Sequence, residues 1–414
     1  MTVFELLKGV DCGCGRRHEC PIENVVIGKN AFESLPGLCR GYEKILLVCD
    51  ENTYAAAGKK AEAVLGPQVS ERIVFPGSSV LIPDERAIEA VKARTAGKDL
   101  LLGAGSGVIQ DLCKYVSKET GIPYMIVATA PSMDGYASDG AAMILGGMKV
   151  TVKAGLPKAI LADTGVLKNA PKEMIRSGFG DIMGKYSALC DWKLSALVTG
   201  EYFCPFIYEE TYETVRRVRE LSGRIFSGDG ESIAVLMEAL VKVGIMMSFA
   251  GTSRPASGSE HHLSHFFEIT GIEKKVPYFA HGIDVGYSTV ITQRLREELL
   301  TLPAWPARPV FDRKAWEEGL ARVYGSVAPG VIQLQDRLSY HENGFPEPPW
   351  EDVKAVLREA PSSEELEEIL SGAGFDMKEF ICMYGEEKIR DAVKYGKDLK
   401  DRYTVLWLYE YRNG

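Results

Sequence analysis

Short apolar runs alternate with helical patterns over roughly the first 165 residues of the chain. This alternation is the signature of a parallel α/β layer. The apolar runs predict buried strands at Lys44–Cys49, Asp99–Gly103, Tyr124–Ala128 and Ala159–Ala162. Helices are expected between them at Thr53–Leu65 and Asp84–Thr95. The run Met143–Lys153 has two central glycines and predicts a hairpin before the last strand.

The pattern changes after Asp163, where the strand-like runs stop and helical stretches follow one another. Several keep an apolar period of 3.6 residues or are apolar almost all round: Arg176–Val198, Ser232–Ala250 and Glu364–Leu370. A chain of 414 residues also exceeds the size at which one core keeps growing. We therefore expect an α/β domain with a parallel sheet over residues 1–166 and an all-helical domain over residues 167–414.

Composition excludes several classes of function. The net charge of −9 argues against a nucleic-acid surface, which needs clustered Lys and Arg. The longest apolar candidate, Ile233–Ala250, is interrupted by Glu238 and Lys242, so no membrane span is expected. The first residues lack the basic and apolar regions of a signal peptide. We expect a cytoplasmic protein.

Nine cysteines, an odd number spread along the chain, are read mostly as thiols. The exception is a cluster of four soft ligands within nine residues: Cys12, Cys14, His18 and Cys20. Their spacing is tighter than that of usual zinc-finger pairs. The sequence allows two interpretations of this cluster, a small structural zinc site and an N-terminal loop without metal.

Histidines are concentrated in one part of the chain, because His261, His262, His265 and His281 are four of only six. His261 and His265 share one face of a predicted helix. Asp181 is an acid inside an apolar helical stretch, where it needs either a metal or a partner such as Lys185. One carboxylate and two imidazoles suit a catalytic divalent metal with an open position, whereas hydrogen-bonded core histidines are the alternative.

A glycine-rich turn, Gly105-Ser106-Gly107, stands between a predicted strand and a predicted helix. Backbone N–H groups at such a turn can approach phosphate oxygens, although the motif fits neither a Rossmann fingerprint nor a P-loop. Asp50 ends another strand, where it can accept from a ribose hydroxyl or cap the next helix. The segment Thr129–Ser138 follows a third strand with hydroxyls and a carboxylate, in the position where open α/β sheets bind ligands.

These motifs occur together and in order, and their combination resembles the sn-glycerol-1-phosphate dehydrogenase family. That family lies within the superfamily of dehydroquinate synthase, glycerol dehydrogenase and iron-dependent alcohol dehydrogenases. The resemblance runs from about Pro21 to about Leu300, and Thr129–Tyr136 is its most specific part. The early Cys-x-Cys-Gly-x-x-His element is similar to the bacterial branch. Ser106 departs from the superfamily, which more often has three consecutive glycines at this turn.

The resemblance implies a dinucleotide-binding domain over residues 1–166, a metal- and substrate-binding domain over residues 167–414, and roles for individual residues. Asp181, His261 and His281 match metal ligands, with Asp181 counted among the catalytic residues, and Asp134 and His265 match substrate-binding positions that could relay a proton. Asp50 matches the acid near the adenosine ribose. The other nucleotide contacts match Gly105, Ser106, Gly107, Val108, Ile109, Thr129, Ala130, Pro131, Ser132 and Ser138. Lys185 and Arg254 are the nearest candidates in sequence for a substrate phosphate.

The activity implied is metal-dependent, NAD(P)H-linked and reversible reduction of dihydroxyacetone phosphate to sn-glycerol 1-phosphate. Zinc is the first expectation for the metal, with nickel and iron as alternatives. A polyol or glycerol dehydrogenase and a dehydroquinate synthase-like cyclase are the rival enzymes, and a nucleotide-binding protein without catalysis is the rival from another class. The expected partners are a small phosphorylated substrate and a second copy of the chain, because homodimers are the commonest oligomers.

Overall fold

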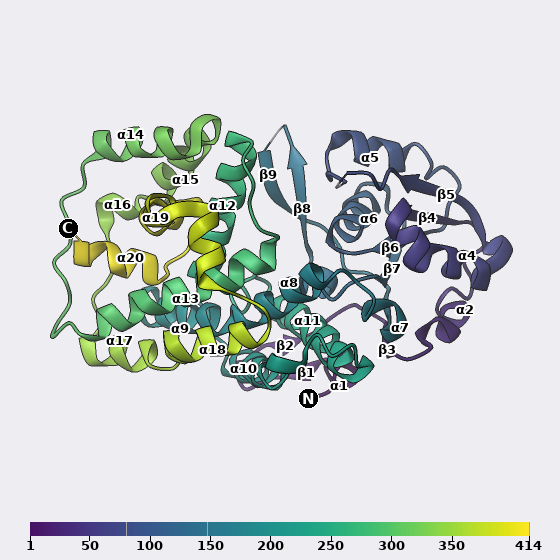
Figure 1. Ribbon diagram of the computed structural model, residues 1–414, viewed down its shortest axis with the longest axis horizontal. Helices are drawn as coiled ribbons and strands as arrows, with labels where there is room; N and C mark the ends of the chain where they lie inside the picture. The colour runs from purple at the N-terminus through teal and green to yellow at the C-terminus, as the bar shows by residue number, and fades with distance from the viewer. Residues whose placement is uncertain (80, 147, 414) are drawn as a thin grey trace. The chain divides into compact units, whose positions relative to one another are not determined.

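The computed structural model describes residues 1–79, 81–146 and 148–413 (Figure 1). The chain packs as two compact units, of which the first is Met1–Gly178 with Arg224–Gly251 and the second is Phe179–Gly223 with Thr252–Gly414. This division differs from the expected boundary at 166/167. The physical reason is that α11 (Gly230–Ala250), although it comes from the helical half of the sequence, packs within the first unit.

The first unit is built on a six-stranded sheet in the order β3-β10-β7-β6-β4-β5, with every described pair parallel. Its strands are β3 (Asn24–Gly28), β4 (Ile45–Asp50), β5 (Val69–Phe75), β6 (Leu100–Gly105), β7 (Tyr124–Ala128) and β10 (Ala159–Asp163). The predicted fold class, a parallel α/β layer followed by a helical region, is confirmed. The four predicted strands are the inner ones, and the sequence pattern missed both edges.

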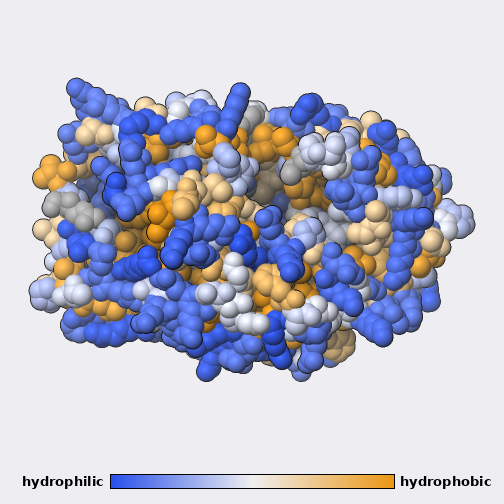
Figure 2. All heavy atoms as spheres, viewed as in Figure 1, coloured by the Kyte–Doolittle hydropathy of each residue, from blue (hydrophilic) through white to orange (hydrophobic). Residues whose placement is uncertain are grey.

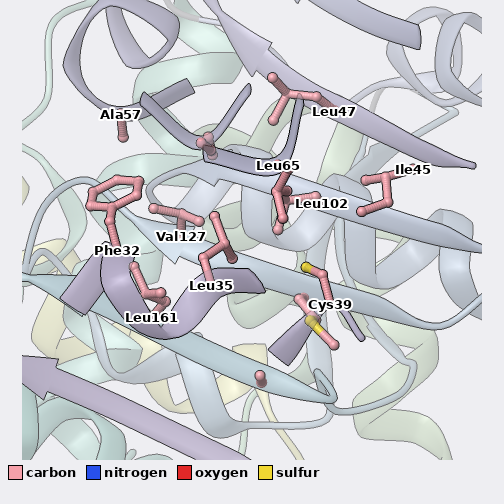
Figure 3. Packing of buried hydrophobic residues seen from close by; sticks show 14 of the residues in the cluster. Phe32, Leu35, Cys39, Ile45, Leu47, Ala57, Leu65, Leu102, Val127 and Leu161 are labelled. Atoms are coloured by element: carbon pink, nitrogen blue, oxygen red, sulfur yellow. The ribbon is translucent and has the colours of Figure 1, made fainter. Parts of the chain in front are cut away.

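One face of the sheet packs against α2 (Leu35–Leu38) and α4 (Lys59–Leu65). Figure 3 shows this layer, in which Phe32 and Leu35 lie against Val127 and Leu161 of the strands. Burying side chains of this size contributes about 1.5–3 kcal/mol each. The expected helix Thr53–Leu65 is present as α3 (Glu51–Thr53), one π-helical turn at Tyr54–Gly58, and α4.

The opposite face is covered by α6 (Gly107–Thr120), against which α5 (Glu85–Lys92) packs. Gly103 of β6 marks the close approach, because a Cβ there would lie 3.1 Å from Cys113 Sγ of α6. The expected hairpin is present as β8 (Gly140–Leu145) and β9 (Met148–Lys153), which pair antiparallel. Its second turn glycine, Gly147, lies outside the described residues.

The remaining elements of the first unit are short, apart from α11. They are α1 (Val3–Leu6), β1 (Val10–Asp11), β2 (Arg17–His18), the 3₁₀ turn η4 (Asp134–Ala137) and α7 (Thr164–Leu167). Helix α11 packs on η4, and a Cβ on Gly244 would lie 2.9 Å from the Asp134 carbonyl oxygen. By length and composition α11 could cross a bilayer, but 72% of its apolar window is buried in the fold, as in a core helix.

The second unit contains helices and no strand among its described residues. Helix α8 (Lys172–Met183) begins in the first unit and ends in the second. The other helices are α9 (Lys185–Thr199), α10 (Pro205–Arg219), α12 (Ser259–Lys274), α13 (His281–Leu300), α14 (Arg313–Tyr324), α15 (Ala328–Leu338), α16 (Tyr340–Asn343), α17 (Trp350–Leu357), α18 (Ser363–Gly372), α19 (Met377–Tyr395) and α20 (Val405–Glu410).

A core of this unit joins α9, α17 and α20 through side chains that include Leu194, Val353 and Trp407. Helices α12 and α13 lie against each other and also contact α9. Hydrophilic side chains predominate on the face of the molecule shown in Figure 2, with smaller hydrophobic patches between them. Helices α8, α12 and α13 carry the residues for which the sequence predicts metal chemistry.

Candidate metal centre and nucleotide-binding edge

Asp181 of α8, His261 of α12 and His281 of α13 form the Asp–His–His cluster. One ligand atom from each lies within 4.8 Å of the others, and His261 Nε2 is 3.7 Å from Asp181 Oδ1. Asp181 is fully buried and His261 is 5% exposed. Residues separated by as many as 100 positions are therefore assembled in one small space inside the second unit.

Two glycines, Gly180 of α8 and Gly184 between α8 and α9, let this part of the chain pack closely enough against its neighbours to form the cluster. A Cβ on Gly180 would lie 2.2 Å from the Gly282 carbonyl oxygen at the start of α13. A Cβ on Gly184 would lie 2.4 Å from Val285 Cγ1. Larger residues at these two positions would push α13 and His281 away from Asp181. The glycines beside Asp181 thus have a packing function that brings the ligand atoms together.

Glu260 orients His261. Its Oε1 lies 2.6 Å from His261 Nδ1 and accepts from the Gly258 N–H at 2.8 Å. Burial, followed by the nearby charge of Asp191, raises the pKa of Glu260 to about 7. When Glu260 is ionised, Nδ1 donates to it and Nε2 keeps the lone pair that faces Asp181. The sequence analysis gave Glu260 no role; its only signal there is a carboxylate next to a candidate ligand, and the fold shows that this carboxylate is fully buried.

Lys185 donates to Asp181 Oδ1 at 2.6 Å, and both side chains are fully buried. The salt bridge that the spacing of four residues suggested is therefore present. The same carboxylate also faces His261, so the ion pair and a ligand role coexist in this geometry. Burial and, next, the charge of Lys185 hold the pKa of His261 well below its usual value. The imidazole is therefore neutral at neutral pH, which is the form that binds metals.

His281 and His265 complete the group of imidazoles. The Ser264 hydroxyl lies 3.3 Å from His281 Nδ1 and donates to the His281 carbonyl oxygen at 3.2 Å. The ring centroid of His265 is 5.5 Å from that of His281 and 6.0 Å from that of His261. His265 thus lies beside the Asp–His–His cluster without belonging to the set of closest ligand atoms. His262, by contrast, points into the core and is fully buried.

The donor set fits a divalent metal. A carboxylate and two imidazoles are borderline ligands suited to zinc, nickel or iron, and three protein ligands leave room for substrate or water. Glu260 and Ser264 provide partners on the Nδ1 sides of the two rings, and such partners orient metal-binding imidazoles. The chemistry and burial of these residues therefore agree with the expected metal role.

The carboxyl ends of β4, β6 and β7 form the nucleotide edge, where most of the predicted cofactor residues lie. Asp50 ends β4, Gly105 ends β6, and Thr129 follows β7. Strand β4 leads to β5 on one side, whereas β6 leads to β7 and β10 on the other. The connections after β4 and after β6 therefore run to opposite sides of the sheet. Open parallel sheets bind ligands at such a switch point.

The glycine turn makes a direct transition from β6 to α6. Ser106 stands in the N-cap position without a side-chain cap, and Gly107, Val108 and Ile109 begin the helix. A Cβ on Gly105 would lie 2.4 Å from Ile109 Cβ, so this glycine serves close packing. A Cβ on Gly107 would meet only Met133, at 3.5 Å. The helix N-terminus, with its unpaired N–H groups, is thus available for an anion such as a pyrophosphate.

The segment after β7 lies beside this turn, because the Thr129 N–H donates to the Gly105 carbonyl at 3.1 Å. Thr129, Ser132 and Ser138 are mostly buried, as are Ala130 and Pro131. The Tyr136 hydroxyl donates to the Ala130 carbonyl at 2.8 Å and shapes the loop. Asp134 begins η4 and is half-buried. The structure thus gathers these residues in the first unit.

Asp50 acts as a helix cap. Its Oδ1 accepts from the Thr53 N–H at 2.8 Å, and the Thr53 hydroxyl lies 3.0 Å from the Asp50 nitrogen. The capping role weighed at the sequence level is therefore present. A single oxygen serves the cap, and the residue is only half-buried at the nucleotide edge. Capping and contact with a ribose are thus compatible.

Arg254 has a different role from the one expected. Its Nη1 donates to the Tyr403 carbonyl at 3.0 Å and its Nη2 to Ser195 Oγ at 2.7 Å. Its Nε donates to Glu201 at 3.1 Å, and the side chain is 6% exposed. All three guanidinium nitrogens are engaged inside the second unit. Arg254 thus forms a buried ion pair with Glu201. Of the two residues suggested for the substrate phosphate, Lys185 is the one that lies beside the Asp–His–His cluster.

Comparisons with known proteins first define the class. A model of the iron-containing alcohol dehydrogenase family matches residues 26–171. The solved structure of a 1,3-propanediol oxidoreductase superposes with a TM-score of 0.63 at 14% identity, covering 95% of this chain and 97% of that one. The archaeal Red Sea brine pool alcohol dehydrogenase ADH/D1 gives a TM-score of 0.61 at 15% identity, covering 98% and 99%. The fold is that of the iron-containing alcohol dehydrogenases.

Curated relatives then narrow the class. Glycerol-1-phosphate dehydrogenase (NAD(P)+) of Geobacillus stearothermophilus is 39% identical over 288 residues, which cover 68% of this chain and 71% of that protein. The protein of the same name from Bacillus subtilis is 31% identical over 392 residues, covering 93% and 90%. The chain belongs to the glycerol-1-phosphate dehydrogenase family, a family of oxidoreductases, and the resemblance seen in the sequence motifs is confirmed.

Proposed function

We propose that this protein catalyses the reversible reduction of dihydroxyacetone phosphate to sn-glycerol 1-phosphate with NADH or NADPH. The observation that carries the proposal is the Asp–His–His cluster, in which a buried carboxylate and two imidazoles lie within 4.8 Å of one another. Membership of the glycerol-1-phosphate dehydrogenase family supports the choice of substrate. The glycine turn and its helix N-terminus support a dinucleotide at the nucleotide edge of the first unit.

Asp181, His261 and His281 are the residues that would hold the divalent metal, with zinc as the first expectation and nickel or iron as alternatives. When bound, such an ion polarises a carbonyl group and stabilises negative charge on its oxygen. Glu260 holds the His261 ring in the tautomer whose Nε2 faces Asp181. Lys185 holds the Asp181 carboxylate and adds positive charge that favours an anionic substrate.

A bound NADH or NADPH would supply the hydride that the carbonyl carbon accepts, and the carbonyl oxygen would take up a proton. His265, beside the cluster, is our candidate for holding the substrate and relaying that proton, with Asp134 as the second substrate-binding candidate. The cofactor contacts proposed for the nucleotide edge are Asp50, Gly105, Ser106, Gly107, Val108, Ile109, Thr129, Ala130, Pro131, Ser132 and Ser138. A homodimer and a cytoplasmic location remain our expectations.

The test is the loss of NADH or NADPH absorbance when purified protein of assayed metal content meets dihydroxyacetone phosphate. Unphosphorylated dihydroxyacetone serves as the control substrate. Oxidation that requires the phosphate and disappears with a chelator is the expected result. Preference for the unphosphorylated ketone would instead indicate a polyol dehydrogenase. Inactivity with both ketones, in protein that binds metal and NAD, would overturn the proposal in favour of a cyclase-type phosphate elimination.

A further inference from the structure

A β-hairpin near the N-terminus carries a second group of metal-binding side chains. Strands β1 and β2 pair Val10 with His18 across a tight turn. The Cys12 N–H donates to the Arg16 carbonyl at 3.2 Å, and the Gly15 N–H donates to the Cys12 carbonyl at 3.1 Å. Gly15 has a φ of +82°, a conformation that side-chain-bearing residues rarely adopt. The turn therefore has a definite shape, set by its own backbone.

This turn brings the ligand atoms of Cys12, Cys14 and His18, the Cys–Cys–His cluster, within 4.8 Å of one another. Cys14 Sγ lies 3.5 Å from His18 Nε2. The two cysteines are half-buried and are not joined by a disulfide. Two thiols and an imidazole at this separation are the soft donor set that zinc prefers in structural sites.

His18 is held in place for such a role. Its side chain is 1% exposed, and its ring stacks on Phe249 at the end of α11 with centroids 5.3 Å apart. Burial lowers the pKa of His18, whereas a hydrogen bond with the Phe249 backbone acts in the opposite direction. The stacking against Phe249 anchors the ring in this position. Second partners of this kind orient the ring of a metal-binding histidine.

The pairing of the two strands by itself contributes little to the stability of this hairpin. Each strand is two residues long, and a two-stranded hairpin is marginally stable by itself in water. The ion pairs of Arg17 with Asp11 and Glu19 are solvent-exposed and contribute little. A metal held by residues on both sides of the turn would close the hairpin and fix it against α11, as disulfides or metals do in small elements with little core.

We infer that Cys12, Cys14 and His18 bind a structural zinc ion, distinct from the metal of the proposed catalytic site. Binding releases the two thiol protons to solvent and forms two zinc–sulfur bonds and one zinc–nitrogen bond. Structural zinc is four-coordinate, so one further donor completes the site. Cys20, the fourth soft residue of the sequence motif, is not grouped with these three among the described residues. Burial raises the pKa of its thiol, which interacts with Ile22 and Ser248.

The experiment measures metal content of the full-length protein by elemental analysis. The wild type is expected to contain about two metal ions per chain, one for each donor set. Cys12→Ser with Cys14→Ser should lose one of them and keep the proposed dehydrogenase activity, with a lower Tm. Cys382→Ser, at an exposed thiol, is the matched control and should lose none. His261→Ala should lose the other ion, so the two donor sets are tested independently.

Cobalt substitution provides a second readout that does not depend on activity. Thiolate-to-cobalt charge-transfer absorption is expected in the wild type and in His261→Ala, and it should vanish in the cysteine double variant. Unchanged metal content in that variant, or a wild type without this absorption, would overturn the inference. Serine substitution of each remaining cysteine in turn then finds the fourth donor.

If the double variant fails to fold, His18 provides the decisive pair of variants. His18→Cys keeps a zinc ligand and should retain the metal, whereas His18→Ala should lose it. Wild-type protein gives a further check, because Cys12 and Cys14 should react with a thiol reagent faster after chelation than before it. Equal reactivity before and after chelation would also overturn the inference.

Discussion

The nucleotide edge and the Asp–His–His cluster are built in different ways. At the nucleotide edge, the predicted cofactor residues follow the ends of β4, β6 and β7, and the glycine turn offers backbone N–H groups to a ligand. In the cluster, side chains from α8, α12 and α13 supply the chemistry, and the helix backbones only set their spacing. Substitutions at the glycine turn should therefore act through shape, whereas substitutions in the cluster should act through chemistry.

The largest effect is expected for Asp181→Ala, which removes the carboxylate proposed to bind the metal and breaks the buried ion pair with Lys185. Loss of metal-assisted charge stabilisation costs several kcal/mol, so kcat/KM should fall by about 10³-fold or more. His265→Ala is the comparison: it should keep the metal and lose turnover. Metal analysis together with steady-state kinetics checks both. Wild-type metal content and turnover in Asp181→Ala would mean that the cluster is structural.

Glu260→Gln should have the next largest effect. The amide has the same size as the carboxylate but is neutral, so it makes His261 a weaker ligand. The expected loss in metal affinity is about 10–100-fold. Ser264→Ala removes a neutral contact to His281 and should lower the metal affinity by a smaller factor. Metal titration of the stripped protein measures both affinities. Equal affinities in wild type and Glu260→Gln would show that Glu260 does not tune the ligand.

Gly105→Ala tests shape at the nucleotide edge. The added Cβ meets Ile109 Cβ at 2.4 Å, and overpacking of this kind costs about 1–3 kcal/mol of unfolding free energy. Gly107→Ala, where a Cβ has only an ordinary contact, should fold like the wild type. Thermal unfolding without NADH measures the loss of stability, and the rise in Tm on adding NADH measures cofactor binding. Weaker NADH binding by a fully stable Gly107→Ala would show that the cofactor approaches this backbone closely.

The smallest effect is expected for Asp50→Ser, which keeps an N-cap residue but removes the charge. Less repulsion of the extra phosphate should favour NADPH over NADH by about 1 kcal/mol, roughly fivefold in Kd. Asp84→Ser is the matched control, since Asp84 caps α5 in the same way and is not one of the predicted cofactor residues. Fluorescence titration with each cofactor measures the ratio. An unchanged ratio of the two Kd values would show that Asp50 acts only as a helix cap.

The sequence predicted the inner strands, the hairpin and the helical region because apolar periodicity reports burial directly. It missed β3 and β5 because edge strands are half-exposed, as Ser70, Glu71 and Arg72 in β5 illustrate. It also placed α11 with the helices that surround it in the sequence, since periodicity gives the type of an element and not its partner. For the candidate site, ligand types were readable, but the contacts of Glu260 and Arg254 depend on tertiary packing.

The first unit is made of two segments that are separated in the sequence, Met1–Gly178 and Arg224–Gly251, and this affects its folding during synthesis on the ribosome. Its sheet is complete once Asp163 has been made, yet α11, which packs on η4, ends only at Ala250. The nascent chain must therefore carry the segment Phe179–Gly223 as a tethered insertion before the unit can close. During that interval the apolar surface that α11 later covers is exposed to chaperones. Truncated nascent chains should accordingly gain protease resistance in this unit only after residue 250 has left the exit tunnel.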